Sequence, residues 1–213
     1  MNIYIIRHGE TDMNVANRLQ GRLDTLLNQK GKSDATNTFS ILEEKGIRID
    51  EVWASPLQRT VETGERASGI DRSDVRFKME KRLLEVDFGP YEGSPISEDP
   101  THYTHAFFSD PANVVAPAGV ESMQELMERA KNFLEELFQY YIEHKDEDRN
   151  LLLVSHGGFT HAITCNILKM PLSDFWSFDV RNCSVTELVP SEDGFVNCEP
   201  VFEGFKRKNM RKF

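Results

Sequence analysis

Two histidines in this sequence each come directly after a short apolar run. Residues 3–6 lead into Arg7, His8 and Gly9, and residues 151–154 lead into Ser155, His156 and Gly157. Continuous apolar runs predict strands buried on both faces, and open α/β sheets keep their chemistry at the carboxyl ends of such strands. A histidine in that place can attack an electrophile or move a proton, and an arginine can bind an anion. We therefore predict that the two histidines share one site.

A second cation and a carboxylate follow two further predicted strands. Arg59 ends the segment Ser55-Pro56-Leu57-Gln58-Arg59, in which Pro56 takes the predicted first helical position and so places Arg59 in the first turn. Glu85 comes soon after the third strand and opens an irregular stretch. Taken singly, each residue has an ordinary structural explanation. Taken together, after strand ends, they indicate one anion-binding catalytic site.

The elements that must position these residues alternate along the chain. Apolar runs predict strands at 3–6, 52–54, 75–77 and 151–154, with a final pair at 185–189 and 195–202. Helical patterns fill residues 32–45, 56–68, 122–144 and 158–168. This alternation predicts an α/β fold, a three-layer α/β/α arrangement around a mostly parallel central sheet. At 213 residues without an internal linker, we expect one domain over residues 1–213.

Residues 122–144 give the clearest helical pattern. Ser122 and Glu125 form a capping box at its start, and one stripe is apolar, made of Leu126, Ala130, Phe133, Leu134, Leu137 and Tyr141. The preceding residues 86–121 have no regular period and contain five prolines, Pro90, Pro95, Pro100, Pro111 and Pro117. We expect a long covering loop there, of the kind that often binds ligands.

Composition excludes several classes of protein. A formal charge of −10 argues against nucleic acid and anionic membranes as partners. Three cysteines without paired spacing indicate neither a disulfide framework nor a zinc site, and the chain start resembles neither a leader nor a membrane span. We expect a cytoplasmic protein with reduced thiols. The basic tail, residues 205–213, is an electrostatic exception, for which a frayed, solvated segment is the favoured interpretation.

These residues match, in order, the signature of the histidine phosphatase superfamily, the phosphoglycerate-mutase-like proteins. The chain resembles that family over nearly its whole length through Arg7-His8-Gly9-Glu10-Thr11, Asn14, Asn17 to Gly21, Ser55 to Arg59, Glu85, Gly89, Glu92-Gly93, Pro117 to Gly119, Glu121-Ser122 and Ser155 to Gly158. The resemblance implies the family fold and a reaction through a phosphohistidine, with no cofactor and no metal.

Roles follow for the matching positions. A phosphomonoester reacts extremely slowly without catalysis, so its site must bind the charge and supply an oriented nucleophile. We assign His8 as the nucleophile, and Arg7, Arg59 and His156 as the groups that bind the phosphoryl oxygens. Glu85 is the expected proton donor to the leaving oxygen, with a pKa raised by burial under the loop as the hypothesis. Asn14, Gln20 and Gly21 are the expected substrate-binding residues.

The acceptor of the phosphoryl group divides the family into phosphatases and mutases. Residues 83–128 contain no Lys or Arg but several acids, which favours a phosphatase of a small phosphorylated metabolite over a mutase that must bind a second anion. Aromatic side chains of the same segment either contact the leaving group or close the core, and Arg18, Arg22 or the tail could supply cations. A phosphoglycerate mutase and an inactive phospho-ligand-binding protein remain the alternatives, and a homodimer is an option.

Overall fold

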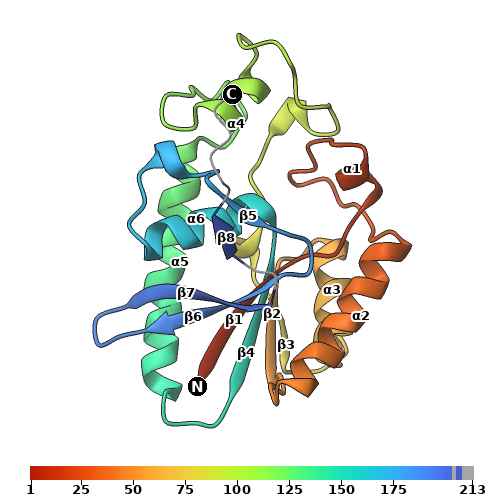
Figure 1. Ribbon diagram of the computed structural model, residues 1–213, viewed down its shortest axis with the longest axis vertical. Coiled ribbons are helices and arrows are strands. Elements are labelled where there is room, and N and C mark those ends of the chain that lie inside the picture. Colours follow the sequence, from red (N-terminus) through yellow and green to blue (C-terminus); the bar gives the residue numbers. More distant parts are fainter. Residues whose placement is uncertain (203–204, 208–213) are drawn as a thin grey trace.

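A six-stranded sheet forms the centre of the molecule (Figure 1). The computed structural model describes residues 1–202 and 205–207. Its strand order is β3-β2-β4-β1-β6-β7; the first four strands run parallel, β6 pairs antiparallel with β1, and β7 pairs antiparallel with β6. The strands are β1 (Asn2–Arg7), β2 (Glu51–Ala54), β3 (Phe77–Met79), β4 (Asn150–Ser155), β6 (Val185–Pro190) and β7 (Phe195–Phe202). The predicted, mostly parallel sheet is confirmed.

Strand register brings the carboxyl ends of three strands to one level. Arg7 of β1 lies opposite Ser155 of β4, and Ala54 of β2 lies opposite Val154 of β4. Beyond these pairs the His8 amide donates to the Ser155 carbonyl (2.9 Å), and the Ser55 amide donates to the Val154 carbonyl (3.0 Å). The residues that follow these strands therefore start from one edge of the sheet.

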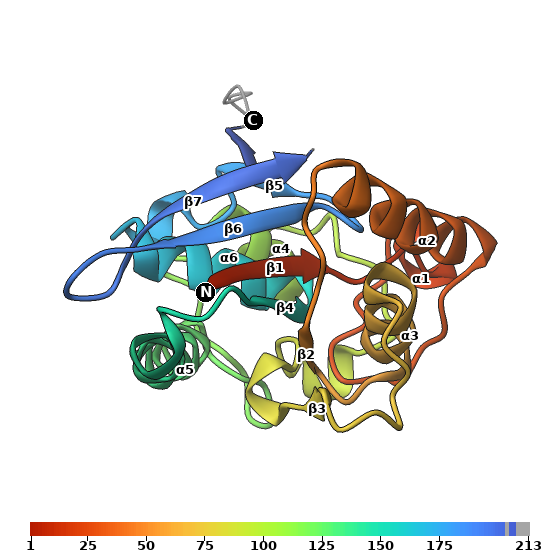
Figure 2. The same cartoon turned by 90° about the horizontal axis from the view of Figure 1, so that it is seen from below.

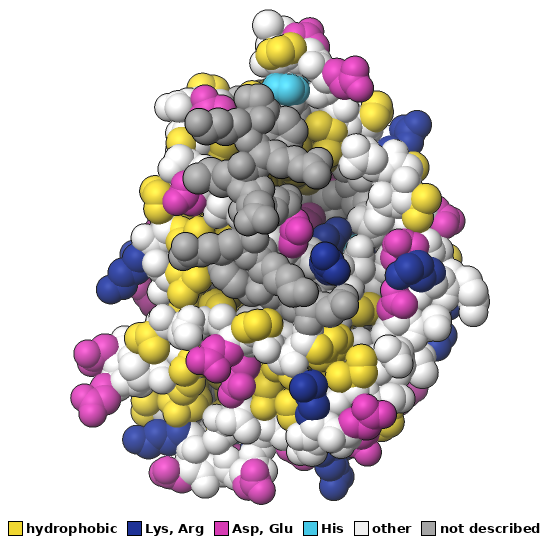
Figure 3. Space-filling model, viewed as in Figure 1, with side chains coloured by type: hydrophobic (Ala, Val, Ile, Leu, Met, Phe, Trp, Pro, Cys, Tyr) yellow, Lys and Arg dark blue, Asp and Glu magenta, His cyan; other side chains and the backbone are white. Residues whose placement is uncertain are grey.

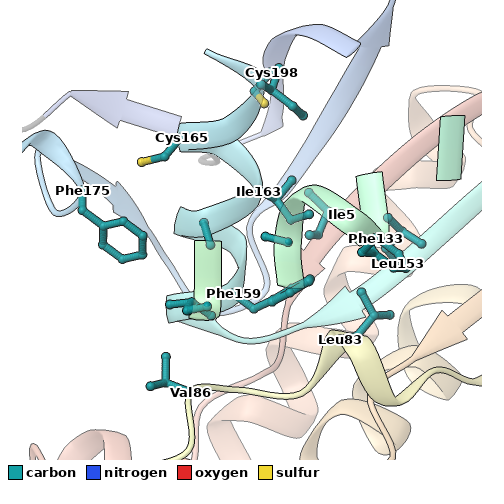
Figure 4. Close-up of a cluster of buried hydrophobic side chains, with 14 of the residues drawn as sticks. Ile5, Leu83, Val86, Phe133, Leu153, Phe159, Ile163, Cys165, Phe175 and Cys198 are labelled. Carbon is teal, nitrogen blue, oxygen red and sulfur yellow. The ribbon is translucent and has the colours of Figure 1, made fainter. Parts of the chain in front are cut away.

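Two apolar layers cover the two faces of the sheet, as the uninterrupted apolar runs predict. Ile3, Ile5, Leu151 and Leu153 belong to a buried cluster with Phe133 and Phe159, whereas their neighbours in sequence face a second cluster. The first layer contains α5 (Met123–His144) and α6 (Gly157–Ile167), and the second contains α2 (Gln29–Glu44) and α3 (Gln58–Ser68). Figure 2 shows the helix pairs on either side of the sheet, and Figure 4 shows the first cluster.

Three predicted boundaries are wrong because distant groups decide them. The third strand is Phe77–Met79, not 75–77, and Val75 is exposed in the preceding turn. Helix α3 begins at Gln58, after Pro56, because the Asp24 carboxylate accepts bonds from the amide and side chain of Gln58 (2.7 and 2.9 Å). Helix α2 begins at Gln29, earlier than predicted, with the Asn28 side chain as its cap. The capping box of α5 is confirmed.

The covering loop contains helical structure that the sequence pattern did not indicate. Residues 86–121 include a 3₁₀ turn (Gly89–Tyr91) and helix α4 (Tyr103–Ser109). Two other short helical segments lie earlier in the chain, helix α1 (Asp12–Val15) and a 3₁₀ turn at Lys81–Leu83. Phe107 of α4 is buried and its ring packs against Phe88 and Trp176. Because these partners are remote in sequence, tertiary packing stabilises a helix too short to form alone.

A second, two-stranded sheet joins β5 (Phe178–Val180) to β8 (Phe205–Arg207), and a 3₁₀ turn covers Leu172–Asp174. The expected frayed tail is therefore wrong for residues 205–207, and its remainder, residues 208–213, lies outside the described residues. No helix among the described residues is long and apolar enough to cross a membrane. Cys165, Cys183 and Cys198 are free and buried, and burial raises the pKa of each thiol to about 12.

Candidate active site

His8 follows β1 directly and is buried, with one ring nitrogen already bonded. Its Nδ1 lies 2.7 Å from the Gly9 carbonyl, which can only accept, so Nδ1 carries the proton and Nε2 keeps its lone pair in the neutral ring. Burial, and then the charges of Arg59 and Arg7, hold the pKa of His8 well below its ordinary value. The ring is therefore neutral at physiological pH, as a nucleophile requires.

His156 follows β4 and is fully buried beside His8. The two ring centroids are 5.2 Å apart in an edge-to-face arrangement, so the predicted pairing of the histidines is confirmed by the geometry. The Nε2 atom of His156 lies 2.8 Å from the Ser55 hydroxyl. Burial and the charge of Arg59 hold the pKa of His156 well below its ordinary value, so this ring is neutral as well. In this structure His156 therefore adds no positive charge to the site.

Arg59 lies in the first turn of α3, as predicted, and is fully buried. Its Nη1 and Nη2 donate to the carbonyls of Leu23 (2.6 Å) and Gly21 (2.7 Å). Burial lowers the pKa of the guanidinium to about 10, which leaves it cationic at neutral pH. Gly21 has φ of 49°, a conformation that glycine adopts readily, and this turn directs its carbonyl to Arg59.

Arg7 is held from the opposite side of the site. Its Nη1 donates to the Val180 carbonyl of β5 (2.7 Å), and burial lowers the pKa of the guanidinium. Three donors around His8 are buried without a partner among the described residues: Arg7 Nε, Arg59 Nε and His156 Nδ1. Buried polar groups are normally hydrogen-bonded, so three such groups together indicate a place for an anion.

Glu85 lies against the beginning of α6. Its Oε1 accepts from the amides of Val86 (3.0 Å) and Phe159 (3.1 Å), and its Oε2 accepts from the Gly158 amide (3.1 Å). Since α6 begins directly after His156, this contact brings the carboxyl to the same sheet edge as the histidines. Oε2 has one donor where Oε1 has two, which leaves Oε2 the oxygen with room for a proton.

The predicted substrate-binding residues form one polar chain beside His8. Asn14 completes the capping box of α1, whose N-cap is Thr11: the Oδ1 of Asn14 accepts from the amide and the hydroxyl of Thr11 (both 3.1 Å), which leaves its Nδ2 free to donate elsewhere. Gln20 Oε1 accepts from the hydroxyls of Thr11 (2.9 Å) and Thr25 (2.7 Å). In the described residues Gln20 and Gly21 thus support Asn14 and Arg59, and their contact with substrate stays a prediction.

Several supporting residues were missed by sequence reasoning. Ser55 bonds to His156, Thr63 accepts from the Gly9 amide (2.9 Å), and Asn182 donates to the His8 carbonyl (2.8 Å). Ser55 stands in a recognised motif and directly follows a strand, a signal that could have revealed it. Thr63 and Asn182 carry no such signal, because only the fold brings them to residues 8 and 9.

Cations at the rim of the site are already engaged by the covering loop. Arg22 pairs with Asp87 (3.0 Å), and Arg18 donates to the Gly93 carbonyl (2.6 Å). Basic side chains lie near the middle of the face shown in Figure 3, with an acidic side chain directly beside them. No cluster of three or more His, Cys, Asp or Glu suited to a metal occurs in the described residues.

The aromatic side chains of the loop pack against the core. Phe107 and Phe108 pack on each other and on Trp176 and close the core. Tyr91 contacts the rings of His102 and Tyr103, packs against the core cluster and stays half-buried. A contact of Tyr91 with the leaving group stays a prediction.

Comparisons with known proteins agree with this geometry. The family model of the histidine phosphatase superfamily (branch 1) matches residues 3–199. The chain is 29% identical to phosphoserine phosphatase 1 of Hydrogenobacter thermophilus over 186 residues, 86% of this chain and 84% of the relative. It is 30% identical to a probable phosphoglycerate mutase GpmB of Shigella dysenteriae over 191 residues, 88% and 84% of the two chains. A mycobacterial glucosyl-3-phosphoglycerate phosphatase structure in complex with VO3 superimposes with a TM-score of 0.74 at 26% identity, covering 93% and 96%.

Proposed function

This chain belongs to the histidine phosphatase superfamily (branch 1), and from that premise we propose that it hydrolyses a small phosphomonoester through a phosphohistidine on His8. It is a phosphatase of the histidine type, as its phosphatase-named relatives indicate. One observation supports the site assignment above all others: three buried nitrogens, Arg7 Nε, Arg59 Nε and His156 Nδ1, have no hydrogen-bond partner among the described residues and lie around a neutral histidine.

In the first step His8 Nε2 attacks phosphorus. The N–P bond forms while the P–O bond to the leaving group breaks, and the leaving oxygen takes a proton from Glu85. The phosphoryl oxygens receive hydrogen bonds from the two arginines and His156, which stabilise the negative charge of the transition state without any rearrangement. His8 Nδ1 stays protonated throughout and donates its hydrogen bond to the Gly9 carbonyl, which holds the ring in the tautomer that can attack.

In the second step water attacks the phosphohistidine. Glu85, now a carboxylate, takes the proton from this water as the new O–P bond forms and the N–P bond breaks. Orthophosphate leaves, and His8 returns to its neutral form. Each group thus ends the cycle in its starting state.

Water is the favoured acceptor because the rim cations Arg22 and Arg18, both within the described part of the chain, are already engaged. Arg22 and Arg18 bind the covering loop itself, and Asp87, Glu92 and Glu121 lie around them. A mutase would need cations there for the carboxylate and second phosphate of its substrate. A phosphoglycerate mutase is the second candidate, since one relative at 30% identity carries that name.

The test measures phosphate release from p-nitrophenyl phosphate and from a panel of phosphomonoesters without added metal, with His8→Ala as the control. We expect turnover and an acid-labile phosphohistidine in the unchanged protein and neither in the variant. The panel includes 3-phosphoglycerate with and without 2,3-bisphosphoglycerate; mutase flux above phosphate release would favour the mutase. No turnover and no phosphohistidine with any substrate would favour an inactive phospho-ligand-binding protein.

A homodimer and a cytoplasmic location are proposals from the sequence alone. The first is tested by measuring the mass of the purified protein in solution. A monomeric mass at all working concentrations would exclude the homodimer.

A further inference from the structure

Arg129 of α5 makes contacts that no step above uses. We propose that Arg129, held by Glu121, is the positioning residue that fixes Glu85 for proton transfer. The inference rests on the proposed function, because it takes Glu85 to be the proton donor. Arg129 and Glu121 are both charged, and neither belongs to the residues proposed to contact the substrate.

The guanidinium of Arg129 binds the backbone that carries Glu85. Its Nη1 donates to the carbonyls of Arg82 (2.7 Å) and Leu84 (2.8 Å), and its Nη2 reaches the carbonyl of Glu85 itself (3.4 Å). Few regular bonds restrain this segment, since it leaves a single 3₁₀ turn and enters the covering loop. Arg129 therefore supplies the bonds that a strand or helix would otherwise provide.

Glu121 fixes the orientation of that guanidinium. Its two oxygens accept from Arg129 Nε (2.8 Å) and Nη2 (2.9 Å) in a bidentate pair, and both side chains are largely buried. Glu121 also accepts from the Asp87 amide (3.1 Å), two residues beyond Glu85. The pair thus binds the chain on both sides of the proton donor.

Arg129 also contacts the residue that holds the Glu85 carboxyl. Its guanidinium carbon lies 4.8 Å from the centroid of the Phe159 ring, and the Phe159 amide donates to Glu85 Oε1. One side chain therefore touches both the backbone of Glu85 and the helix end that receives its carboxyl. A shift of Arg129 moves these two parts relative to each other.

The contacts exclude a direct role in binding substrate. An arginine has five N–H donors, and all five of Arg129 are used by Glu121 and the three carbonyls. None is left for a phosphoryl oxygen. A lysine has the same charge but lacks the planar fork, so it cannot reproduce this set.

The experiment compares two substrates that differ in their need for an acid. The leaving oxygen of an alkyl phosphate, β-glycerol phosphate, needs a proton, whereas that of 2,4-dinitrophenyl phosphate leaves readily as an anion. The ratio of the two kcat/KM values in one preparation does not depend on the fraction of folded protein. We expect Arg129→Met to lower this alkyl-to-aryl ratio about tenfold, as a displaced catalytic group does, and Arg129→Lys to lower it in the same direction.

Arg82 offers a matched control. It forms a bidentate pair with Glu80 and lies 5.3 Å from the Phe133 ring centroid, but its side chain donates to no carbonyl near Glu85. We expect Arg82→Met to leave the ratio unchanged, and Arg129→Met to add no further selectivity in a Glu85→Gln background.

The outcomes separate the inference from the proposed function. A selective loss in Glu85→Gln with an unchanged ratio in Arg129→Met overturns the positioning role alone. If Glu85→Gln itself loses both activities equally, the assignment of Glu85 as the acid is wrong, and the role of Arg129 fails with it.

Discussion

Gly158 stands where a single added methyl group would displace Glu85, the proposed proton donor. A Cβ atom built on this glycine lies 2.7 Å from Glu85 Oε1 and 2.8 Å from Val86 Cγ2, whereas ordinary contacts begin at 3.4 Å. In Gly158→Ala the carboxyl must therefore move by about 0.7 Å, which weakens its bonds to the amides of Gly158 and Phe159. The carboxyl is the end of a flexible side chain and can give way, whereas the buried Val86 side chain must shift as well, so we also expect some loss of stability.

The larger expected cost falls on catalysis. A misplacement of roughly 1 Å can cost about a hundredfold in rate, so we expect kcat/KM for an alkyl phosphate to fall by about ten- to a hundredfold, or about 1.4 to 2.7 kcal/mol. The loss with 2,4-dinitrophenyl phosphate should be much smaller, because its leaving oxygen needs no proton. Alanine is favoured over glycine in a helix by about 0.5–1 kcal/mol, which offsets part of the strain.

Steady-state kinetics with both substrates and thermal unfolding of the same preparations measure this. Gly64→Ala is the control: its Cβ would lie 2.9 Å from the Phe77 ring, inside the core and away from the site. We expect that variant to lose about 1–3 kcal/mol of stability and to keep its activity per folded molecule. A folded Gly158→Ala protein with unchanged turnover of the alkyl phosphate would refute the placement of Glu85 in the reaction.

Three further predictions concern the neutral histidines, the Ser55 hydroxyl and a buried carboxylate. Folding lowers the pKa values of His8 and His156, so below about pH 6.5 the unfolded chain binds more protons than the folded one, and the free energy of unfolding should decrease as pH falls through that value. Urea unfolding from pH 5 to 8 measures this dependence. The same dependence on pH in a His8→Gln, His156→Gln double variant would contradict the prediction. Ser55→Ala removes the hydroxyl that orients His156 and should lower kcat/KM about tenfold and the free energy of unfolding by about 1–3 kcal/mol, because Nε2 of the buried His156 loses its partner; unchanged kcat/KM would show that the orientation of His156 needs no support. Glu51 is fully buried at the start of β2, far from the site, and binds Lys78, Arg149, Trp53 and Tyr140. Glu51→Ala should lower the free energy of unfolding, measured by calorimetry, by about 2 kcal/mol and leave kcat unchanged. A stable variant with a low kcat would contradict this purely structural role.

The sequence predicted the sheet well because its signal is local. Both faces of β1 and β4 are buried, so every residue of the two runs must be apolar, and that requirement is visible without knowledge of the partners. The two histidines were equally visible, since His8 and His156 each follow a strand directly. Parallel strands then bring them to one edge in any register that buries the apolar runs.

Boundaries and the short helix α4 were less predictable. Helix α3 begins where the Asp24 carboxylate caps Gln58, although 34 residues separate the two. Helix α4 forms because Phe107 finds Phe88 and Trp176. Neither partner is near in sequence, so no local pattern contains the information.

The sequence by itself thus determined which groups could take part in phosphoryl transfer and on which edge of the sheet they lie. Only the tertiary structure decided their chemical states: the tautomer of His8, the neutral form of both histidines, the three buried nitrogens that have no partner among the described residues, and the full engagement of Arg129. These properties depend on burial and on distances between groups from remote segments. Charge and hydrogen-bond energies change steeply with both, which a linear order of residues does not specify.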